Sequence, residues 1–333
     1  MNGFEMKRRD TIVALLALGA AAGSSMALAQ PAKPPRRIAT LDDSRESGRA
    51  SGWAAFRKRL QELGYTESNG YLIEARWANA QAERLPALAA ELVALKPGVI
   101  VTASTPAALA AKRATSSIPI VFVGAADPIR VGLVKSFARP EANLTGMSII
   151  MSDIVGKWLE LLREIAPKTS TIALLTYTDN PLAMETLREL QQQARPLGMT
   201  VQALDGTTQS NLERAFGTMA RERVNAMIVT PSGNLLDQRQ QIVESAARLR
   251  IPALYARREY PEAGGLMSYG ADYDALFPRA ADYVHRILQG AKPSELPFER
   301  ASVFRLVVNA KAVQALGLTI PESVRVRVDE VIQ

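Results

Sequence analysis

Short runs rich in Val, Ile and Ala alternate with amphipathic segments along nearly the whole chain beyond residue 35. Apolar residues recur at helical spacing in the amphipathic segments, whereas the short runs are apolar almost throughout. Strands that are apolar on both faces must be covered by helices on both faces, as in a parallel sheet. The first series predicts strands at residues 36–41, 71–78, 98–103 and 120–124, with helices near 53–63, 85–95 and 106–115.

The same rhythm restarts around residues 144–151. A short internal match favours a repeated unit, because VIVTAS at 99–104 resembles MIVTPS at 227–232 and each run is followed by a helix and an Ile-Pro pair. Shared strand propensity is an alternative explanation of the match. Two α/β units are expected under either explanation. The second series predicts strands at 171–176, 200–204, 226–230 and 253–256, with helices at 153–165, 182–197, 211–221 and 235–249.

Two units of ordinary domain size account for a chain of 333 residues. We expect a strand at 264–270 and a helix at 273–288 to return the chain to the first unit. The predicted fold class is therefore α/β, with two doubly wound parallel-sheet lobes joined by a hinge and separated by a cleft. Lobe 1 is expected to comprise 36–148 plus about 271–292, and lobe 2 to comprise 149–268 plus a C-terminal segment of about 301–333.

The first 29 residues have the three parts of an export signal: the basic cluster 7–9, the apolar run 11–22, and small residues at 27–29. The apolar run is too short to span a bilayer stably. We expect cleavage after Ala29 and export from the cytoplasm. The Arg-Arg pair leaves both the twin-arginine and the general secretory route open, and the true start is Met1 or Met6.

The chain contains no cysteine. A lipid-anchored exported protein needs a Cys at its cleavage site, so the mature protein is expected to be free in the periplasm. Because it has no disulfides, its stability must come from its apolar core.

The formal net charge is +7, but Lys and Arg are spread along predicted helices without an aromatic-basic patch, so no nucleic-acid partner is expected. The motifs of an exported hydrolase are missing: the chain has no Gly-x-Ser-x-Gly, and its only histidine, His285, falls within a predicted helix. We expect no catalytic residue, metal site or cofactor. The acidic pair Asp42-Asp43 leaves an enzyme that uses carboxylates as a remote alternative.

Polar residues follow the predicted strands, where the loops of a parallel sheet face the crevice. Ser104, Thr105 and Pro106 form a helix start whose free N–H groups could hold a carboxylate, although such caps also occur on helices that bind nothing. Asp127 could pair with a ligand ammonium or only initiate a turn. Tyr255 could stack on a ligand ring, although aromatic residues beside strands are more often core. The predicted ligand-binding set is Ser44, Ser104, Thr105, Asp127, Asn180, Ser232, Tyr255 and Tyr269.

Several segments together resemble a known family. They are LPALAAELVALK at 85–96, TPAALAAK at 105–112, IPIVFV at 118–123, NLTG at 143–146 and GGLMSYG at 264–270, with ALGLTIP near the C-terminus. Together they resemble the ABC-transporter substrate-binding proteins of the tryptophan-binding-protein-like (TrpX-type) family. Where members often carry a Gly-rich or Ser-Pro loop after the first strand, this chain has Asp-Asp-Ser-Arg-Glu at 42–46.

The resemblance implies a type I periplasmic-binding-protein-like fold with a small ligand at the hinge cleft. It implies amino acids or related carboxylates, aromatic ones among them, and delivery to an ABC permease in the inner membrane. We expect a monomer that binds by hinge closure. A periplasmic sensor that presents its ligand to a membrane kinase shares the fold and remains an alternative.

Overall fold

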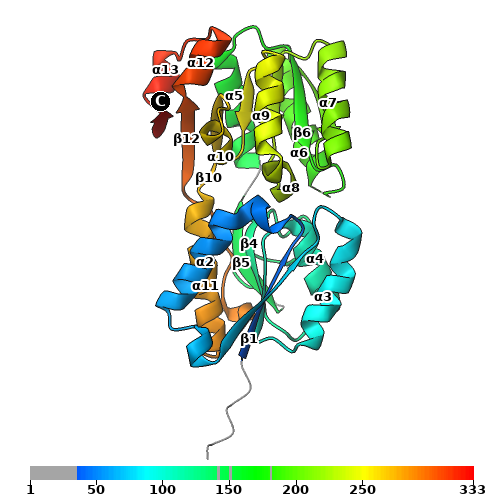
Figure 1. The fold of residues 1–333 in the computed structure, drawn as a ribbon, viewed down its shortest axis with the longest axis vertical. Coiled ribbons are helices and arrows are strands. Elements are labelled where there is room, and N and C mark those ends of the chain that lie inside the picture. Colours follow the sequence, from blue (N-terminus) through cyan, green and yellow to red (C-terminus); the bar gives the residue numbers. More distant parts are fainter. Residues whose placement is uncertain (1–35, 141–142, 150–151, 181) are drawn as a thin grey trace, which may run out of the picture. The chain divides into compact units, whose positions relative to one another are not determined.

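The computed structural model describes residues 36–140, 143–149, 152–180 and 182–333. The predicted export signal lies outside these residues. The segment from Pro35 to Gln333 forms one compact unit that contains two sheets (Figure 1). We call each sheet with the helices that cover it a lobe. The predicted α/β class with two doubly wound sheets is confirmed.

The sheet of lobe 1 is parallel, with strand order β11-β5-β4-β3-β1-β2. Its helices cover both faces. Ile38 and Val99 belong to one apolar cluster with Trp53 of α2, whereas the neighbouring Ala39 and Ile100 belong to a second cluster on the other face. The strands are β1 (Arg36–Asp42), β2 (Tyr71–Trp77), β3 (Val99–Thr102), β4 (Ile120–Ala126), β5 (Leu144–Ile149) and β11 (Glu299–Arg300), and the helices are α2 (Ala50–Glu62), α3 (Leu85–Ala94), α4 (Thr105–Ala114) and α11 (Tyr273–Leu288).

The sheet of lobe 2 has the order β13-β12-β10-β9-β8-β6-β7. Its first five strands in chain order pair as those of lobe 1 do, so β7-β6-β8-β9-β10 corresponds to β2-β1-β3-β4-β5. The strands are β6 (Thr171–Thr176), β7 (Thr200–Asp205), β8 (Ala226–Val229), β9 (Ala253–Tyr255), β10 (Met267–Ala271), β12 (Phe304–Asn309), antiparallel to β10, and β13 (Glu330–Ile332), and the helices are α5 (Ser152–Ile165), α6 (Ala183–Ala194), α7 (Gln209–Arg221), α8 (Gly233–Asp237), α9 (Arg239–Arg248), α10 (Glu259–Glu262), α12 (Ala310–Leu316) and α13 (Glu322–Arg325).

The chain passes between the lobes three times: after β5, between β10 and α11, and between β11 and β12. In Figure 1, α11 lies beside α2 of lobe 1, although it follows the strands of lobe 2 in sequence. The lobe limits expected from the sequence remain a prediction.

One predicted helix is divided in two in the structure. The helix expected at 235–249 begins earlier, at Gly233, and divides at Gln238 into α8 and α9. Gln238 has φ −99° and ψ 13°, outside the helical region. Its side-chain amide donates hydrogen bonds to the carbonyls of Gly206 at 2.7 Å and Asn234 at 3.3 Å. At its other end, α8 begins against lobe 1, where Gly233 lies beside Arg49 and Ser44.

Candidate ligand-binding site

A small cavity of about 50 Å³, which we call the inner pocket, lies between the carboxyl-terminal edges of the two sheets. Its residues mostly follow strands, as expected for parallel sheets. Lobe 1 contributes Asp43, Arg49, Ser104 and Thr105, together with Tyr273 at the start of α11; lobe 2 contributes Tyr177, Asn180, Ser232 and Arg257.

A helix start from lobe 1 opens on the inner pocket. Ser104 has an extended backbone and caps α4, because its hydroxyl accepts a hydrogen bond from the Ala107 N–H at 3.3 Å. Pro106 has no N–H, and the Ala108 N–H donates to the Ser104 carbonyl at 3.0 Å, so in this turn the Thr105 N–H is the one without a partner among the described residues. Ser232 holds the corresponding position before α8 in lobe 2. Its buried Oγ has no hydrogen-bond partner among the described residues, so it can bind a ligand atom.

A buried cluster of charges lies beside this helix start. Arg49 donates through Nη1 to Asp42 and, at 3.1 Å, to Asp43. Asp42 also accepts hydrogen bonds from Trp53 Nε1 at 2.9 Å and from the N–H and hydroxyl of Ser44 at 3.0 and 2.9 Å. Asp42 is thus held by several donors, whereas Asp43 shares a single guanidinium nitrogen with it.

The burial of this cluster changes two pKa values. Desolvation raises the pKa of Asp43 from 3.8 to about 6; Arg49 opposes this shift, and the negative charge of Asp42 adds to it. Burial alone would lower the pKa of Arg49, but Asp42 and Asp43 together raise it above its ordinary value. Arg49 therefore stays charged, and Asp43 titrates near pH 6.

A second buried cation comes from lobe 2. Arg257 is 6% exposed, and its Nε donates to Glu259 at 3.2 Å. Its guanidinium carbon lies 3.9 Å from the ring centre of Tyr273. Desolvation opposes the charged form of Glu259, yet Arg257 holds the pKa of this carboxyl below its usual range. Arg257 therefore reaches the inner pocket already paired with an anion.

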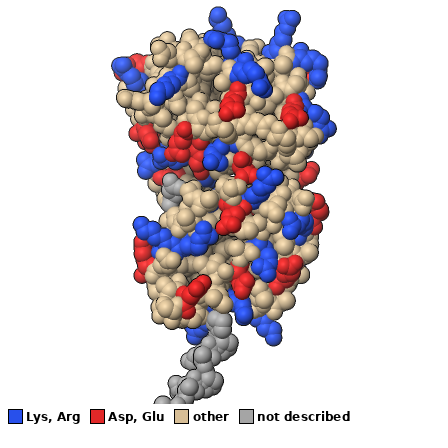
Figure 2. Space-filling model, in the orientation of Figure 1, with Lys and Arg blue, Asp and Glu red and all other residues tan. Residues whose placement is uncertain are grey.

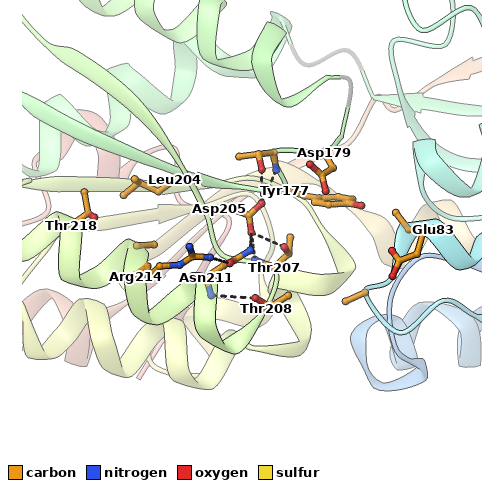
Figure 3. Close-up of a pocket in the computed structure, with 14 residues that line it drawn as sticks. Glu83, Tyr177, Asp179, Leu204, Asp205, Thr207, Thr208, Asn211, Arg214 and Thr218 are labelled. Atoms are coloured by element: carbon orange, nitrogen blue, oxygen red, sulfur yellow. Dashed lines mark hydrogen bonds between the residues drawn. The ribbon is translucent and has the colours of Figure 1, made fainter.

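A larger cavity of about 460 Å³, which we call the outer groove, adjoins the inner pocket at Tyr177, which lines both (Figure 3). Glu83 of lobe 1 faces Tyr177 and Asp179 of lobe 2 across this groove. Asp205 is fixed in its wall, because it accepts hydrogen bonds from both the N–H and the hydroxyl of Thr178, at 3.0 and 2.7 Å, and from the Asn211 amide at 2.7 Å.

The structure brings four of the eight predicted site residues together at the inner pocket. They are Ser104, Thr105, Asn180 and Ser232. Ser44 lies behind this pocket and binds Asp42 instead of lining the cavity.

The other three predicted residues line neither cavity. The Asp127 carboxylate accepts from the Arg130 N–H at 3.1 Å and pairs with its side chain. Tyr255 is buried in the core of lobe 2, where its ring stacks on Tyr260 with centres 4.5 Å apart. The Tyr269 ring stacks on Phe304 at 6.2 Å.

Five charged or aromatic residues that line the inner pocket were not in the predicted set. Asp43, Tyr177 and Arg257 follow strands; the strand-end rule makes Asp43 and Arg257 candidates from the sequence, and it also covers Tyr177. Arg49 and Tyr273 lie at helical segments, and their sequence pattern carries no sign of a site.

Comparison with known proteins identifies the family. The model of the ABC transporter substrate binding protein family matches residues 46–332. This chain belongs to that family. The substrate-binding proteins of ABC transporters are solute-binding proteins that act outside the cytoplasm, not enzymes. Among the described residues, no helix has the length and apolar character needed to cross a membrane.

Individual proteins are similar over most of the chain. The "Tyrosine-binding protein" of Clostridioides difficile (strain R20291) is 26% identical over 264 residues, which cover 79% of this chain and 75% of the relative. A Streptococcus pneumonia ABC domain in complex with L-Trp is 25% identical, with a TM-score of 0.81 and coverage of 90% and 100%. A conserved domain protein of Vibrio cholerae O1 biovar El Tor is 26% identical, with a TM-score of 0.82 and coverage of 89% and 99%.

The surface agrees with a solute-binding role. On the face in Figure 2, Lys and Arg side chains are interspersed with Asp and Glu. Many of the described basic residues are also paired, as Arg59 is with Asp282 at 2.9 Å and Arg130 with Glu189 at 2.9 Å. On this face, the basic side chains therefore do not gather into a patch of one sign.

Proposed function

We propose that this protein is the periplasmic solute-binding component of an ABC importer, and that its ligand is an amino acid or a related small carboxylate. The observation that carries the proposal is the inner pocket, where residues of both lobes meet at the ends of their strands. A solute bound there contacts both lobes, and its differential affinity for the closed arrangement drives hinge closure. An inner-membrane permease then receives the solute.

The contacts between the lobes support a closing motion. Arg45 of lobe 1 donates to Asp237 of lobe 2 at 3.0 Å, and Ser47 donates to the same carboxylate. Farther along the chain, Arg130 of lobe 1 pairs with Glu185 at 3.4 Å and Glu189 at 2.9 Å on α6 of lobe 2. At least one side chain of each of these ion pairs is exposed to solvent. The pairs are therefore individually weak and can open when the ligand leaves.

The polar groups of the inner pocket suit a carboxylate. The start of α4 supplies the Thr105 N–H and a favourable dipole, and the Ser232 hydroxyl approaches from lobe 2. A cavity of about 50 Å³ admits only the head group of an amino acid, so the remainder of the ligand extends past Tyr177 toward the outer groove. The relatives named for tyrosine and crystallised with L-Trp support an amino-acid ligand.

The test is isothermal titration calorimetry of the mature protein, from residue 30, against the twenty amino acids. We expect one-to-one binding of at least one of them, and a stabilisation of about 2.7 kcal/mol when that ligand is present at one hundred times its Kd. Ser104→Ala should weaken binding, whereas Ser136→Ala, which removes another hydroxyl that accepts a backbone N–H, should not. Absence of binding throughout the panel would refute the amino-acid ligand.

A further inference from the structure

The outer groove is lined mainly by polar side chains. Four of its fourteen described lining residues are alanine or leucine, and the others carry a hydroxyl, a carboxylate, an amide or a guanidinium. Lobe 2 contributes most of them, whereas Glu83 belongs to the segment of lobe 1 between β2 and α3. This lining does not suit a purely hydrocarbon group, because each polar atom that such a group covers loses its water without gaining a partner.

Several donors in this lining already have partners. The hydroxyls of Thr178 and Thr207 both donate to Asp205, at 2.7 and 2.6 Å. The Asn211 amide donates to the same carboxylate at 2.7 Å. Arg214, the one Lys or Arg of the described lining, donates through Nη2 to the Asn211 side chain. The Asp205 carboxylate is therefore occupied, and the three donors around it are already used.

Two acceptors in the groove have no partner among the described residues. They are the carboxylates of Glu83 and Asp179, which make neither a hydrogen bond nor an ion pair with that part of the chain. The two residues come from opposite lobes and lie on either side of the groove, next to Tyr177 (Figure 3). The hydrogen-bonding capacity that the groove offers to a ligand is therefore mainly that of acceptors.

Tyr177 is an independent sign that the groove holds part of a ligand. The residue is 5% exposed, yet its hydroxyl points into the groove and has no hydrogen-bond partner in the described part of the chain (Figure 3). Burial raises the pKa of this hydroxyl, and the negative charges of Asp43, Asp179 and Asp205 raise it further. The hydroxyl therefore stays protonated and lies in a negative potential, where a ligand group that donates hydrogen bonds is favoured over one that accepts them.

We infer that the outer groove is the subsite for the ligand side chain, and that Glu83 and Asp179 select side chains that end in a hydrogen-bond donor over side chains that end in hydrocarbon. This inference rests on the proposed function and narrows its ligand class to amino acids with a distal hydroxyl, amide, ring N–H or guanidinium. Such a group gives the two carboxylates a partner, whereas a hydrocarbon end only displaces their water. Because one carboxylate comes from each lobe, the same donor also favours closure.

The titration of the wild-type protein with the twenty amino acids gives the first test. We expect the tightest binders to carry a distal donor, and each to bind about fivefold more tightly than a matched analogue without it, the value of one ordinary hydrogen bond. Matched pairs are L-tyrosine with L-phenylalanine, and L-tryptophan with 3-benzothienyl-L-alanine, in which sulfur replaces the ring N–H. Tightest binding by a hydrocarbon side chain, or equal affinities within a pair, would overturn the inference and leave the proposed function standing. No binding by any amino acid would overturn both.

A double variant tests the two carboxylates. Glu83→Ala combined with Asp179→Ala should bring the affinity ratio within each pair close to one and leave the affinity for the analogue without a donor within about twofold. Both side chains are exposed, so the fold does not depend on them. Glu67→Ala, which removes another exposed carboxylate of lobe 1 outside both cavities, should leave the ratio unchanged. A wild-type ratio in the double variant, or a parallel loss of both affinities, would overturn the assignment.

Discussion

Gly233 at the start of α8 in lobe 2 lies directly against Arg49 of lobe 1. A Cβ atom on Gly233 would be 2.6 Å from Arg49 Nη1 and 2.6 Å from the Ser44 Cβ, closer than real Cβ contacts allow. Arg49 cannot move away easily, because Asp42 and Asp43 hold its guanidinium. This contact between the two lobes thus depends on the absence of a side chain at residue 233, and it involves the same arginine that lines the inner pocket.

Gly233→Ala should therefore oppose closure without disturbing either lobe, since the three atoms nearest to the added methyl belong to the other lobe. We expect ligand affinity to fall about 5- to 160-fold, because overpacking of this kind costs about 1–3 kcal/mol. Gly217→Ala in α7 is the control: its methyl would meet no atom within 4 Å, and the variant should bind normally. Calorimetry measures both, and normal binding by Gly233→Ala would contradict this account of closure.

Asp237→Ala should weaken closure by a different route, because it removes the acceptor of both Arg45 and Ser47. We expect a loss of affinity of about twofold to fivefold, as is typical of exposed ion pairs. The loss should shrink at 1 M salt, where the wild-type pair is itself screened. A salt-independent loss would mean that Asp237 acts through the fold of α8 instead.

Ser232→Ala should separate binding from stability. The Ser232 Oγ is buried without a partner among the described residues, so its removal should leave the free energy of unfolding of the ligand-free protein within about 0.5 kcal/mol of wild type. Ligand affinity should fall about 2- to 12-fold, the value of one ordinary hydrogen bond. Denaturant unfolding and calorimetry measure the two quantities. Parallel losses in both would show that the hydroxyl is structural.

Ligand binding should depend on pH through Asp43. Its pKa is raised to about 6 in the folded protein, and its carboxylate must be ionised to attract an ammonium. Of the groups that face it, Arg49 and Tyr177 both have pKa values raised above their ordinary ones, so neither changes its charge in this window. Affinity for the amino acid should therefore fall up to about tenfold for each pH unit below 6, and the slope should vanish in Asp43→Asn.

The stability of the ligand-free protein should change with pH in the opposite direction to ligand affinity. Because the pKa of Asp43 is higher in the folded than in the unfolded chain, the folded state binds more protons between about pH 4 and pH 6. The contribution of Asp43 to the free energy of unfolding therefore falls as pH rises through that window and stays lower above it. Thermal unfolding of Asp43→Asn and of wild type, each at pH 4.5 and 7.5, isolates the contribution of Asp43 to the free energy of unfolding. An identical pH dependence in both proteins would contradict the pKa shift.

The architecture was largely predictable because buried parallel strands appear in the sequence as short, continuous apolar runs. The apolar runs at 99–102 and 226–229 became the central strands β3 and β8, and the rule that sites lie at strand ends led to Ser104 and Ser232. The division of α8 from α9 was not predictable, because it depends on the contact between Gln238 and the distant Gly206 carbonyl.

The rule that site residues follow strand ends does not predict every residue of the site correctly. Tyr255 is the last residue of a three-residue strand and lies inside the core, not beyond it. Arg49 reaches the pocket only because Asp42 and Asp43 draw its side chain there, a tertiary effect without a local signature. Asp127 follows β4 as expected, but Arg130 binds its carboxylate.

Ligand-driven closure of the two lobes is tested most directly by the distance between them. Since the chain has no cysteine, Lys58→Cys in α2 and Glu244→Cys in α9, both exposed sites, allow two fluorophores to be attached selectively. Energy transfer between them should rise on titration with the amino acid, saturate at one ligand per protein, and reverse when the unaltered ligand is removed. Binding without any change in energy transfer, or conversion of the ligand into a product, would contradict the account.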